Sequence, residues 1–297
     1  MVHVVGALGT LSGSEMGMNR EVKQRWAGMP LLYGSAAIHV AAAAVTLARP
    51  RLWPWTLGAV ALDHLLIATG GLWPRSTWLG PNWTRLPARG AARGEAATGE
   101  IAITIDDGPD PEVTPRVLEV LAAFEARASF FCIGDRVTRY PDLAQEIVRR
   151  GHSVENHSQR HRHTFSLLGP AHMAAEIAQA QETIAQVTGE RPRFFRAPAG
   201  LRNPFLEPIL QRLKLQLVSW TRRGFDTVNA DADDVYRRLS RSLLDGDILL
   251  LHDGHAARAP AGSPAAGTPV ILEVLPRLLE TLRRRQLRPV SLRATLP

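Results

Sequence analysis

Two adjacent carboxylates, Asp106 and Asp107, end a run of alternating isoleucines at 101–105. Gly108 and Pro109 follow, a pair that is typical of the end of a strand. Two neighbouring acids cannot both be buried as anions without a cation nearby, so one needs a positive partner and the other is free to accept a proton. The run therefore predicts a reaction centre at the end of a strand.

Two histidines, His157 and His161, lie four positions apart in the segment NHSQRH at 156–161. One turn of helix would place both rings on the same side. Alone, such a pair is as typical of a solvated helix face as of a metal site. Together with the paired acids it predicts a metal centre, because two imidazoles and one carboxylate form a hydrolytic zinc site with an open position for water. Cobalt, nickel or iron would also suit these ligands.

The order of the motifs resembles the polysaccharide deacetylase family, the NodB-homology carbohydrate esterases. The resemblance extends over about 98–297 and includes FRAPAG at 195–200 and LLHDG at 250–254. It implies that Asp106 is the general base. It also implies three metal ligands, namely Asp107, His157 and His161.

The resemblance implies supporting roles as well. Arg196 would brace the base, and Asp226 falls where the family places the acid that holds this arginine. Pro198 belongs to the family's Arg-x-Pro motif at the substrate. Leu250 and His252 would line the acetyl pocket, with His252 as the general acid. An unperturbed imidazole pKa near 6.5 suits that role, because the departing amine needs a proton.

Two departures from the family pattern bear on the substrate. Ala199 stands where most relatives have an aromatic residue, so only its backbone N–H would serve the oxyanion. The segment after Trp220 lacks the tryptophan that usually follows the acid and walls a polymer-binding groove, and Trp220 itself is interpreted as pocket or core wall. A long glycan chain is therefore less favoured as the substrate.

Other reactive residue types have simpler interpretations. His152, His163 and His255 are expected to be hydrogen-bonded or solvated rather than metal ligands. Cys132 is the single cysteine and lies in an apolar run, so we expect a buried, unreactive thiol and no disulfide within the chain.

Two apolar stretches, 26–48 and 52–73, are each long enough to cross a bilayer. Together, 26–83 is predicted to form a transmembrane helix pair after an N-terminal tail at 1–25, and an Ala-rich amphipathic pair packed on the enzyme is the alternative. A cleaved signal peptide is not favoured, because a second apolar stretch follows the first. Six of the seven tryptophans fall at or just beyond the ends of these stretches, as an interfacial belt requires: Trp26, Trp53, Trp55, Trp73, Trp78 and Trp83.

The basic residues near the two stretches predict the orientation. More of them flank the pair than lie between its members, so the positive-inside rule places both ends, and with them the hydrolase, in the cytoplasm of a bacterial-type inner membrane. If only one stretch spans, the enzyme faces outward. His39, Asp63 and His64 lie near mid-span, and we expect them to pair because an unpaired acid there costs about 2.5 to 3.5 kcal/mol. The flanking residues are Arg20, Lys23, Arg25, Arg75, Arg85, Arg89 and Arg93, and the intervening ones are Arg49 and Arg51.

Residues 84–99 are interpreted as a linker and 100–297 as the deacetylase domain, within which strands and helices alternate. The fold class expected is α/β, a distorted and incomplete (β/α)7 TIM-like barrel preceded by the transmembrane helical hairpin. The loop at 255–267 is interpreted as a disordered insertion or a lid. Expected strands are 101–106, 128–133, 152–157, 194–196, 215–219, 247–252 and 288–292, and expected helices include 112–126, 171–188 and 268–285.

The formal charge of +7 is not accompanied by a nucleic-acid recognition motif, so an anionic membrane surface is the simpler partner. The hypothesis is a membrane-anchored N-deacetylase of an amino sugar, carried on a polyprenyl phosphate, in envelope glycan or lipopolysaccharide metabolism. Alternatives are a deacetylase of exported polysaccharide, peptidoglycan or chitin oligomers, and a noncatalytic membrane-tethered glycan-binding protein. Five arginines near the motifs are candidates for gripping a phosphate or are ordinary solvated residues: Arg160, Arg162, Arg202, Arg222 and Arg223.

Overall fold

A parallel sheet forms the centre of the protein in a computed structural model that describes residues 30–87, 99–254 and 269–296. Its strand order is β5-β4-β3-β2-β1-β7-β6, and β8 pairs with the first part of β1. The order confirms the predicted incomplete barrel. The strands are β1 Gly99–Asp106, β2 Ser129–Cys132, β3 Ser153–Asn156, β4 Phe194–Phe195, β5 Gln216–Leu217, β6 Arg222–Arg223, β7 Ile248–His252 and β8 Leu287–Val290.

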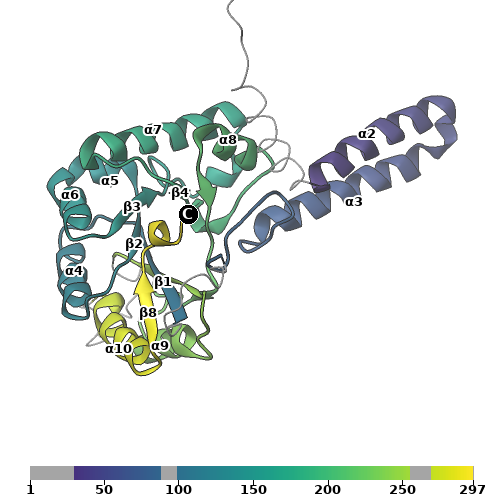
Figure 1. Cartoon of the computed structure of the whole chain (residues 1–297). Coiled ribbons are helices and arrows are strands. Elements are labelled where there is room, and N and C mark those ends of the chain that lie inside the picture. Colours follow the sequence, from purple (N-terminus) through teal and green to yellow (C-terminus); the bar gives the residue numbers. More distant parts are fainter. Residues whose placement is uncertain (1–29, 88–98, 255–268, 297) are drawn as a thin grey trace, which may run out of the picture.

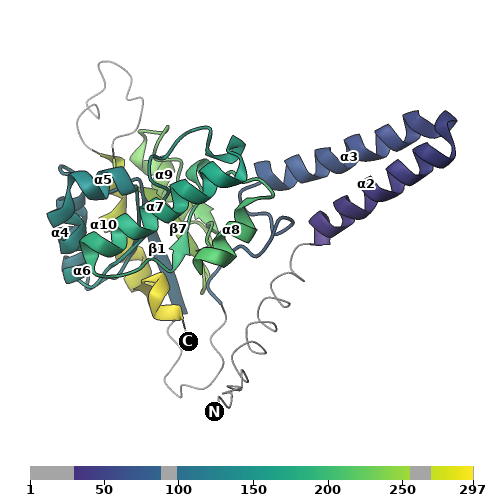
Figure 2. The same cartoon turned by 90° about the horizontal axis from the view of Figure 1, so that it is seen from above.

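Helices cover the outside of this sheet (Figures 1 and 2). The predicted helix at 171–188 is α7, and Gly189 ends it in the left-handed conformation with φ 76°. The other two predicted helices are shorter than expected, and 268 lies outside the described residues. The bounds are α4 Thr114–Ala123, α5 Gly134–Arg139, α6 Pro141–Arg149, α7 Pro170–Thr188, α8 Leu206–Leu213, α9 Ala232–Ser240 and α10 Val270–Arg284.

The alternation along β1 separates the core from the chemistry. Ile101, Ile103 and Ile105 are fully buried in a cluster with apolar residues of α4 and α10, each contributing about 1.5 to 3 kcal/mol by burial. Thr104 and Asp106 fall on the other face because side chains alternate along a strand. The isoleucines therefore fix the register that turns the acid toward the barrel interior.

A two-residue strand, β6, was not predicted. Arg222 and Arg223 pair with Leu249 and Leu250 of β7, although neither arginine is apolar. Gly224 follows, and a Cβ there would lie 2.6 Å from Val235 Cγ1. A glycine at this position therefore lets α9 pack closely against the end of β6.

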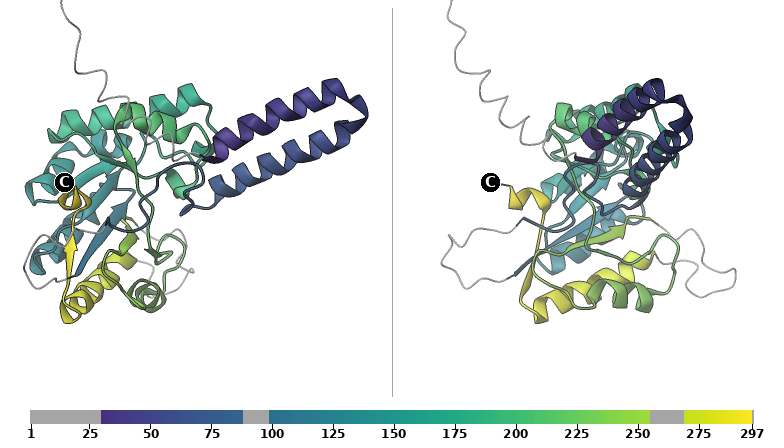
Figure 3. Two further views of the ribbon diagram at one scale, coloured as in Figure 1. Left: turned by 45° about the vertical axis from the view of Figure 1, so that its right-hand side comes forward. Right: turned by 90° about the vertical axis from the view of Figure 1, so that its right-hand side faces the viewer.

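The hairpin of α2 (Pro30–Ala48) and α3 (Trp53–Leu72) projects away from the barrel (Figures 1, 2 and 3). By length and composition both helices could cross a membrane, and a signal sequence near an N-terminus shares these properties. The two helices contact along their length and share a hydrogen bond between Thr46 Oγ1 and Thr56 Oγ1 at 2.8 Å. Exposed apolar side chains along them include Tyr33, Val40, Leu47, Trp53, Trp55, Leu57, Leu62, Leu65 and Leu72.

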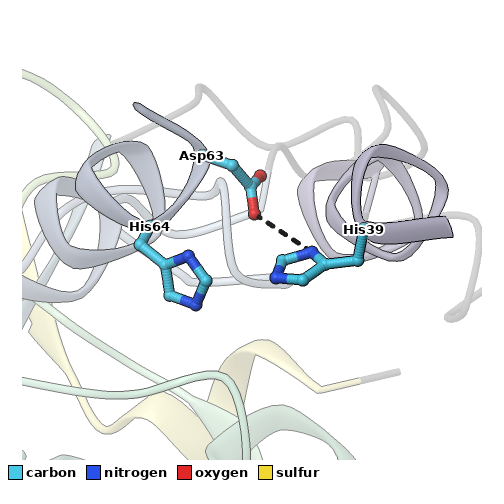
Figure 4. A group of neighbouring side chains, drawn as sticks. All are labelled: His39, Asp63 and His64. Atoms are coloured by element: carbon cyan, nitrogen blue, oxygen red, sulfur yellow. Dashed lines mark ion pairs between the residues drawn. The ribbon is translucent and has the colours of Figure 1, made fainter. Parts of the chain in front are cut away.

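A polar cluster lies between the two helices (Figure 4). Ser35 Oγ donates to Asp63 Oδ2 at 2.6 Å, and His39 Nδ1 lies 3.8 Å from the same oxygen. The His64 ring meets the His39 ring edge to face at 5.1 Å. The expected pairing is confirmed for Asp63 and His39, and Ser35 is an additional partner. His64 joins through the ring contact alone, because its Nδ1 lies 2.8 Å from the Val60 carbonyl oxygen of its own helix.

The segment after α3 packs on the barrel. Trp83 forms a bridge to Val218 beside β5, and Ser219 Oγ donates to the Pro74 carbonyl at 2.6 Å. Arg85 Nη1 reaches Asp247 Oδ1 at 2.7 Å. Most of the linker proposed at 84–99 and the loop proposed at 255–267 lie outside the described residues.

Candidate metal centre and active site

The end of β1 delivers two acids with different surroundings. Asp106 ends the strand and is 3% exposed, whereas Asp107 is partly exposed and adopts a left-handed conformation with φ 75°. Such a conformation is uncommon for a residue with a Cβ and is typical of functional sites. It turns the two consecutive carboxylates to different partners.

The two histidines follow β3 but do not lie on a helix, so the expected helical turn is wrong. His157 and His161 belong to a loop in which Ser158 (φ 63°) and His161 (φ 49°) are left-handed. Ser158 Oγ accepts from the His161 N–H at 3.1 Å. The loop brings the rings to 4.7 Å between centroids.

Asp107, His157 and His161 bring their ligand atoms together. Asp107 Oδ1 lies 3.4 Å from His157 Nε2 and 3.3 Å from His161 Nε2. In a tetrahedral zinc site with bonds of about 2.0 to 2.1 Å, ligand atoms are roughly 3.3 Å apart, so the spacing suits such an ion. Asp107 Oδ1 is buried and has no hydrogen-bond partner among the residues that the structure describes, so a bound cation would supply the missing partner.

His157 is set in the tautomer that a metal ligand needs. Its Nδ1 lies 2.8 Å from the Arg196 carbonyl oxygen, so Nδ1 carries the proton and Nε2 offers its lone pair. Burial raises the pKa of Asp107, but His157 and His161 outweigh burial and lower it. Burial and the neighbouring His157 lower the pKa of His161 to about 4. At neutral pH the cluster therefore holds an anion and a neutral imidazole at His161.

Arg196 holds the other acid. Its guanidinium is 1% exposed and donates from Nη1 to Asp106 Oδ1 at 2.6 Å and to Thr104 Oγ1 at 2.9 Å. Its remaining donors reach the carbonyls of Val218 and Ser219. Asp106 Oδ2 is left 3.8 Å from His157 Nε2, so it faces the ligand cluster. Thr104 was not identified from the sequence, although it lies two positions before Asp106 and so shares its face of the strand.

Asp226 does not hold Arg196, which corrects the expectation. Its Oδ2 accepts the His252 N–H at 2.7 Å and its Oδ1 lies 2.8 Å from His252 Nδ1. Burial opposes protonation of His252, but Asp226, with smaller contributions from Asp106 and Asp107, raises the pKa of this histidine. Arg196 needs no second carboxylate because two carbonyls and Thr104 already occupy its donors.

His252 is placed opposite the general-base candidate. The paired strands β1 and β7 put Asp106 and His252 in register, and Asp253 N–H donates to the Asp106 carbonyl at 2.8 Å. Leu250 lies two positions earlier on β7 and is buried. The proposed base, acid and ligands thus come from the carboxyl ends of neighbouring parallel strands, where barrels of this type build their sites.

The remaining predicted substrate residues lie around Arg196. Pro198 and Ala199 form a short 3₁₀ turn after β4, and Ala199 is left-handed with φ 55°. The Trp220 ring is nearly buried and lies 5.9 Å from Arg196 Cζ. Gly200 is also left-handed, and a Cβ there would lie 2.6 Å from the Trp220 ring. Trp220 therefore packs against one side of Arg196.

Among the described residues, His152, His163 and Cys132 lie outside the ligand cluster. His152 accepts the Ala128 N–H at 3.2 Å, and burial lowers its pKa to about 4. The His163 ring contacts the His161 ring edge to face at 6.2 Å, and His255 lies outside the described residues. Cys132 is fully buried, as predicted, and burial raises the pKa of its thiol.

Comparison with known proteins gives one family. Residues 93–218 match the family model for polysaccharide deacetylase, a range that includes the paired acids, both histidines and Arg196. A peptidoglycan-N-acetylglucosamine deacetylase from Bacillus cereus is 35% identical over 156 residues, which are 52% of this chain and 72% of the relative. A chitooligosaccharide deacetylase from Bradyrhizobium is 30% identical over 192 residues, 64% of this chain and 87% of the relative.

A solved structure indicates the same family. The family 4 carbohydrate esterase from Streptomyces lividans, in complex with acetate, superposes with a TM-score of 0.58 at 32% identity, over 65% of this chain and 93% of the esterase. The shared motifs, the shared barrel and the coverage of these relatives lead to one conclusion: the chain belongs to the polysaccharide deacetylase family.

Proposed function

We propose that the protein is a metal-dependent hydrolase that removes the N-acetyl group from an amino sugar. The observation that carries the proposal is the unpartnered Asp107 Oδ1 beside two imidazole Nε2 atoms, with Asp106 adjacent. Deacetylase relatives from two bacterial groups support the same reaction. Asp107, His157 and His161 would hold the ion, with zinc the first choice and cobalt, nickel or iron the others.

The chain's own residues would divide the proton transfers. A divalent metal, when bound, lowers the pKa of water and polarises the acyl oxygen. Asp106 would accept the water's proton at Oδ2 while Arg196 keeps Oδ1 in place. His252, whose pKa Asp226 raises, would donate a proton to the leaving nitrogen. Each transfer typically contributes about 10²- to 10⁴-fold to the rate.

The acyl group would be bound by residues around this centre. Leu250 and Trp220 would supply apolar walls, and the turn at Pro198 and Ala199 would supply backbone to the oxyanion. Three positions support these roles: the turn follows β4, Leu250 lies on β7 two residues before His252, and Trp220 lies beside Arg196.

We further propose that the hairpin anchors the enzyme in a membrane, with 26–83 as the anchor and 100–297 as the catalytic domain. The apolar, largely exposed faces of α2 and α3 support two spans. The basic residues that flank the pair favour a cytoplasmic domain. A substrate carried on a polyprenyl phosphate at the inner leaflet, within envelope glycan or lipopolysaccharide metabolism, would suit that position.

A second candidate is deacetylation of an exported glycan. The similarity to peptidoglycan and chitooligosaccharide deacetylases favours it. Added protease separates the two locations, because an inward-facing domain survives digestion of intact spheroplasts and an outward-facing one is degraded. Mass spectrometry of lipid-linked and envelope sugars, with and without the protein, then identifies the pool that differs by one acetyl group, about 42 Da.

Acetate release tests the reaction itself. The purified full chain, loaded with zinc, should release acetate from N-acetylated amino sugars, and Asp106→Asn should lower the rate of release by about 10²- to 10⁴-fold. A metal-loaded protein that releases no acetate from any such sugar would overturn the enzyme and leave the noncatalytic glycan-binding protein.

A further inference from the structure

We propose that a pocket lined by arginines beside the active site binds a phosphoryl group carried by the amino-sugar substrate. The inference rests on the proposed function and adds a substrate class to it. The pocket has a volume of about 560 Å³ and lies between β6 and α9. Six charged residues line it, and we call it the arginine pocket: Arg222, Arg223, Arg237, Arg238, Arg241 and Asp234.

The charges in the arginine pocket are not balanced within the described part of the chain. Asp234 is the single acid in its lining, and it accepts from both Arg237 (3.2 Å) and Arg238 (2.6 Å). Arg222 Nε reaches Asp247 Oδ2 at 2.8 Å, but Asp247 lies outside the lining and also pairs with Arg85. Like charges this close repel one another, so an anion in the pocket would relieve the repulsion.

Two arginines of the arginine pocket lack partners for their charge or their N–H groups among the described residues. Arg223 Nε is buried without a hydrogen-bond partner among the described residues. Neither Arg223 nor Arg241 takes part in an ion pair with any described acid. A buried donor without an acceptor is costly, and a bound oxyanion would supply the acceptor.

Aromatic rings hold the guanidinium groups in place. Arg223 Cζ lies 4.9 Å from the Phe225 ring centroid and 5.4 Å from that of Trp220. Arg238 Cζ lies 5.8 Å from the centroid of the same Phe225 ring. Stacking of this kind orients a guanidinium through its face and leaves its N–H donors at the edge for a ligand.

The pocket adjoins the active site through Trp220. The same indole contacts Arg223 of the pocket and Arg196, the arginine that holds Asp106. Three residues after Arg223, Asp226 binds the proposed general acid His252. A sugar whose acetamido group reaches this acid could therefore extend an anionic substituent toward the pocket.

The chemistry of the pocket favours phosphate over other anions. A guanidinium fork matches both carboxylate and phosphate, but a phosphoryl group has more acceptor oxygens and a larger charge to meet several arginines. The other arginines that the sequence offered do not line the arginine pocket. Arg160 and Arg162 contact Glu176. Arg202 donates from Nη2 to the Ser76 carbonyl, and its Nε and Nη1 are buried without a hydrogen-bond partner among the described residues.

Substrate selectivity tests the assignment. N-acetylglucosamine 1-phosphate is compared with methyl N-acetylglucosaminide, which lacks the charge, and with N-acetylmuramic acid, which carries a carboxylate. For the zinc-loaded full chain we expect kcat/KM for the phosphate to exceed both others by about tenfold or more, because charge-assisted hydrogen bonds are the stronger ones. Equal values for the phosphate and the neutral sugar, or for the phosphate and the carboxylate, would overturn the proposal.

A charge-matched pair of double variants assigns the effect to the pocket. Arg237→Gln with Arg241→Gln removes two exposed pocket charges, and Arg283→Gln with Arg285→Gln removes two exposed charges from α10 and the residue after it. Arg237 and Arg283 each follow a paired acid by three positions on a helix, so the helical context is matched. The preference for phosphate should disappear in the first double variant only, and its survival there would contradict the proposal.

Direct binding separates this inference from the proposed reaction. Calorimetry with inorganic pyrophosphate needs no turnover, and the Arg237→Gln and Arg241→Gln double variant should weaken Kd about tenfold or more. His161→Ala should bind pyrophosphate as the parent does, because the pocket does not include the ligand cluster. Binding that is lost with His161→Ala and retained in the arginine variant would overturn the pocket, whatever the acetate assay shows.

A lipid headgroup is the other source of a phosphoryl group. Phosphatidylglycerol in mixed micelles, with phosphatidylcholine as the control, is tested as a competitor of pyrophosphate. Competition by phosphatidylglycerol without any preference for the sugar phosphate would overturn the assignment to the substrate.

Discussion

Asp226 contacts His252 at two points, the backbone N–H and the ring Nδ1. The two contacts fix the imidazole in place and direct Nε2 away from the carboxylate. They also raise the pKa of His252 against the opposing effect of burial. The acid that sequence similarity assigned to Arg196 thus serves the proposed proton donor instead.

The first prediction concerns this pair. Asp226→Asn removes the negative charge that favours the imidazolium, so the pKa of His252 should fall. The alkaline limb of the kcat/KM profile should therefore move to lower pH, because a general acid must be protonated. Glu182→Gln, at an exposed surface ion pair, is the control and should leave the limb in place. An unmoved limb in Asp226→Asn would show that His252 is not the acid.

The second prediction separates the base from the metal ligands. Asp106→Asn keeps an oxygen that can accept from Arg196, so metal content should be unchanged while kcat falls by about 10²- to 10⁴-fold. His161→Ala removes a metal ligand. It should weaken metal affinity by more than the roughly 10- to 100-fold that mutation of a residue supporting a ligand typically costs. Metal analysis after dialysis, together with acetate release, measures both. Equal metal loss in the two variants would contradict the division of roles between Asp106 and Asp107.

The sequence was informative where a simple rule of topology applies. Asp106 and His252 follow apolar runs that could only be buried strands, and parallel strands bring their carboxyl ends to one edge. The grouping of acids and histidines could therefore be predicted before any coordinates. Cys132 was predicted to be buried for the same reason, since its run is apolar throughout.

The sequence was less informative where the backbone departs from regular structure. Ser158 and His161 are left-handed without being glycine, and residues of this kind give no sequence signal, so the helical spacing of the two histidines was misleading. Asp226 lies on an irregular segment after the two-residue β6, and its partner is chosen by tertiary packing. No periodicity predicts which of two nearby cations such an acid binds.

The third prediction concerns the stability of the barrel interior. Arg196→Met would leave Asp106, Thr104 and two carbonyls without their donor in a fully buried position. Removing one partner of a buried ion pair costs about 3 to 5 kcal/mol, so the free energy of unfolding should fall by that order. Arg196→Lys keeps the charge but not the planar fork, so its free energy of unfolding should lie between those of the parent and Arg196→Met. Denaturant unfolding of the full chain in detergent measures all three.

An opposite result is informative for the same residue. If Arg196→Met unfolds at the same denaturant concentration as the parent, the buried pair of Arg196 and Asp106 adds no net stability to the fold. The role of Arg196 in holding Asp106 would then need revision.

The last prediction follows from Asp253, which is buried and forms no ion pair with any basic residue that the structure describes. Burial raises the pKa of this carboxyl to about 7, while the hydrogen bond from Thr114 acts in the opposite direction. Because the folded-state pKa exceeds the unfolded value, the folded state binds more protons between about pH 4 and 7, so stability falls as pH rises through that window and levels off above it. The loss is bounded by about 4 kcal/mol. The contribution of Asp253 is read as a difference between proteins, because the lowered pKa values of His152 and His161 make stability rise with pH over part of the same range. In thermal unfolding from pH 4.5 to 8, Asp253→Asn should gain stability relative to the parent as pH rises, whereas Asp142→Asn, at an exposed position on α6, should follow the parent. An Asp253→Asn variant whose stability changes with pH as the parent's does would exclude the raised pKa of Asp253.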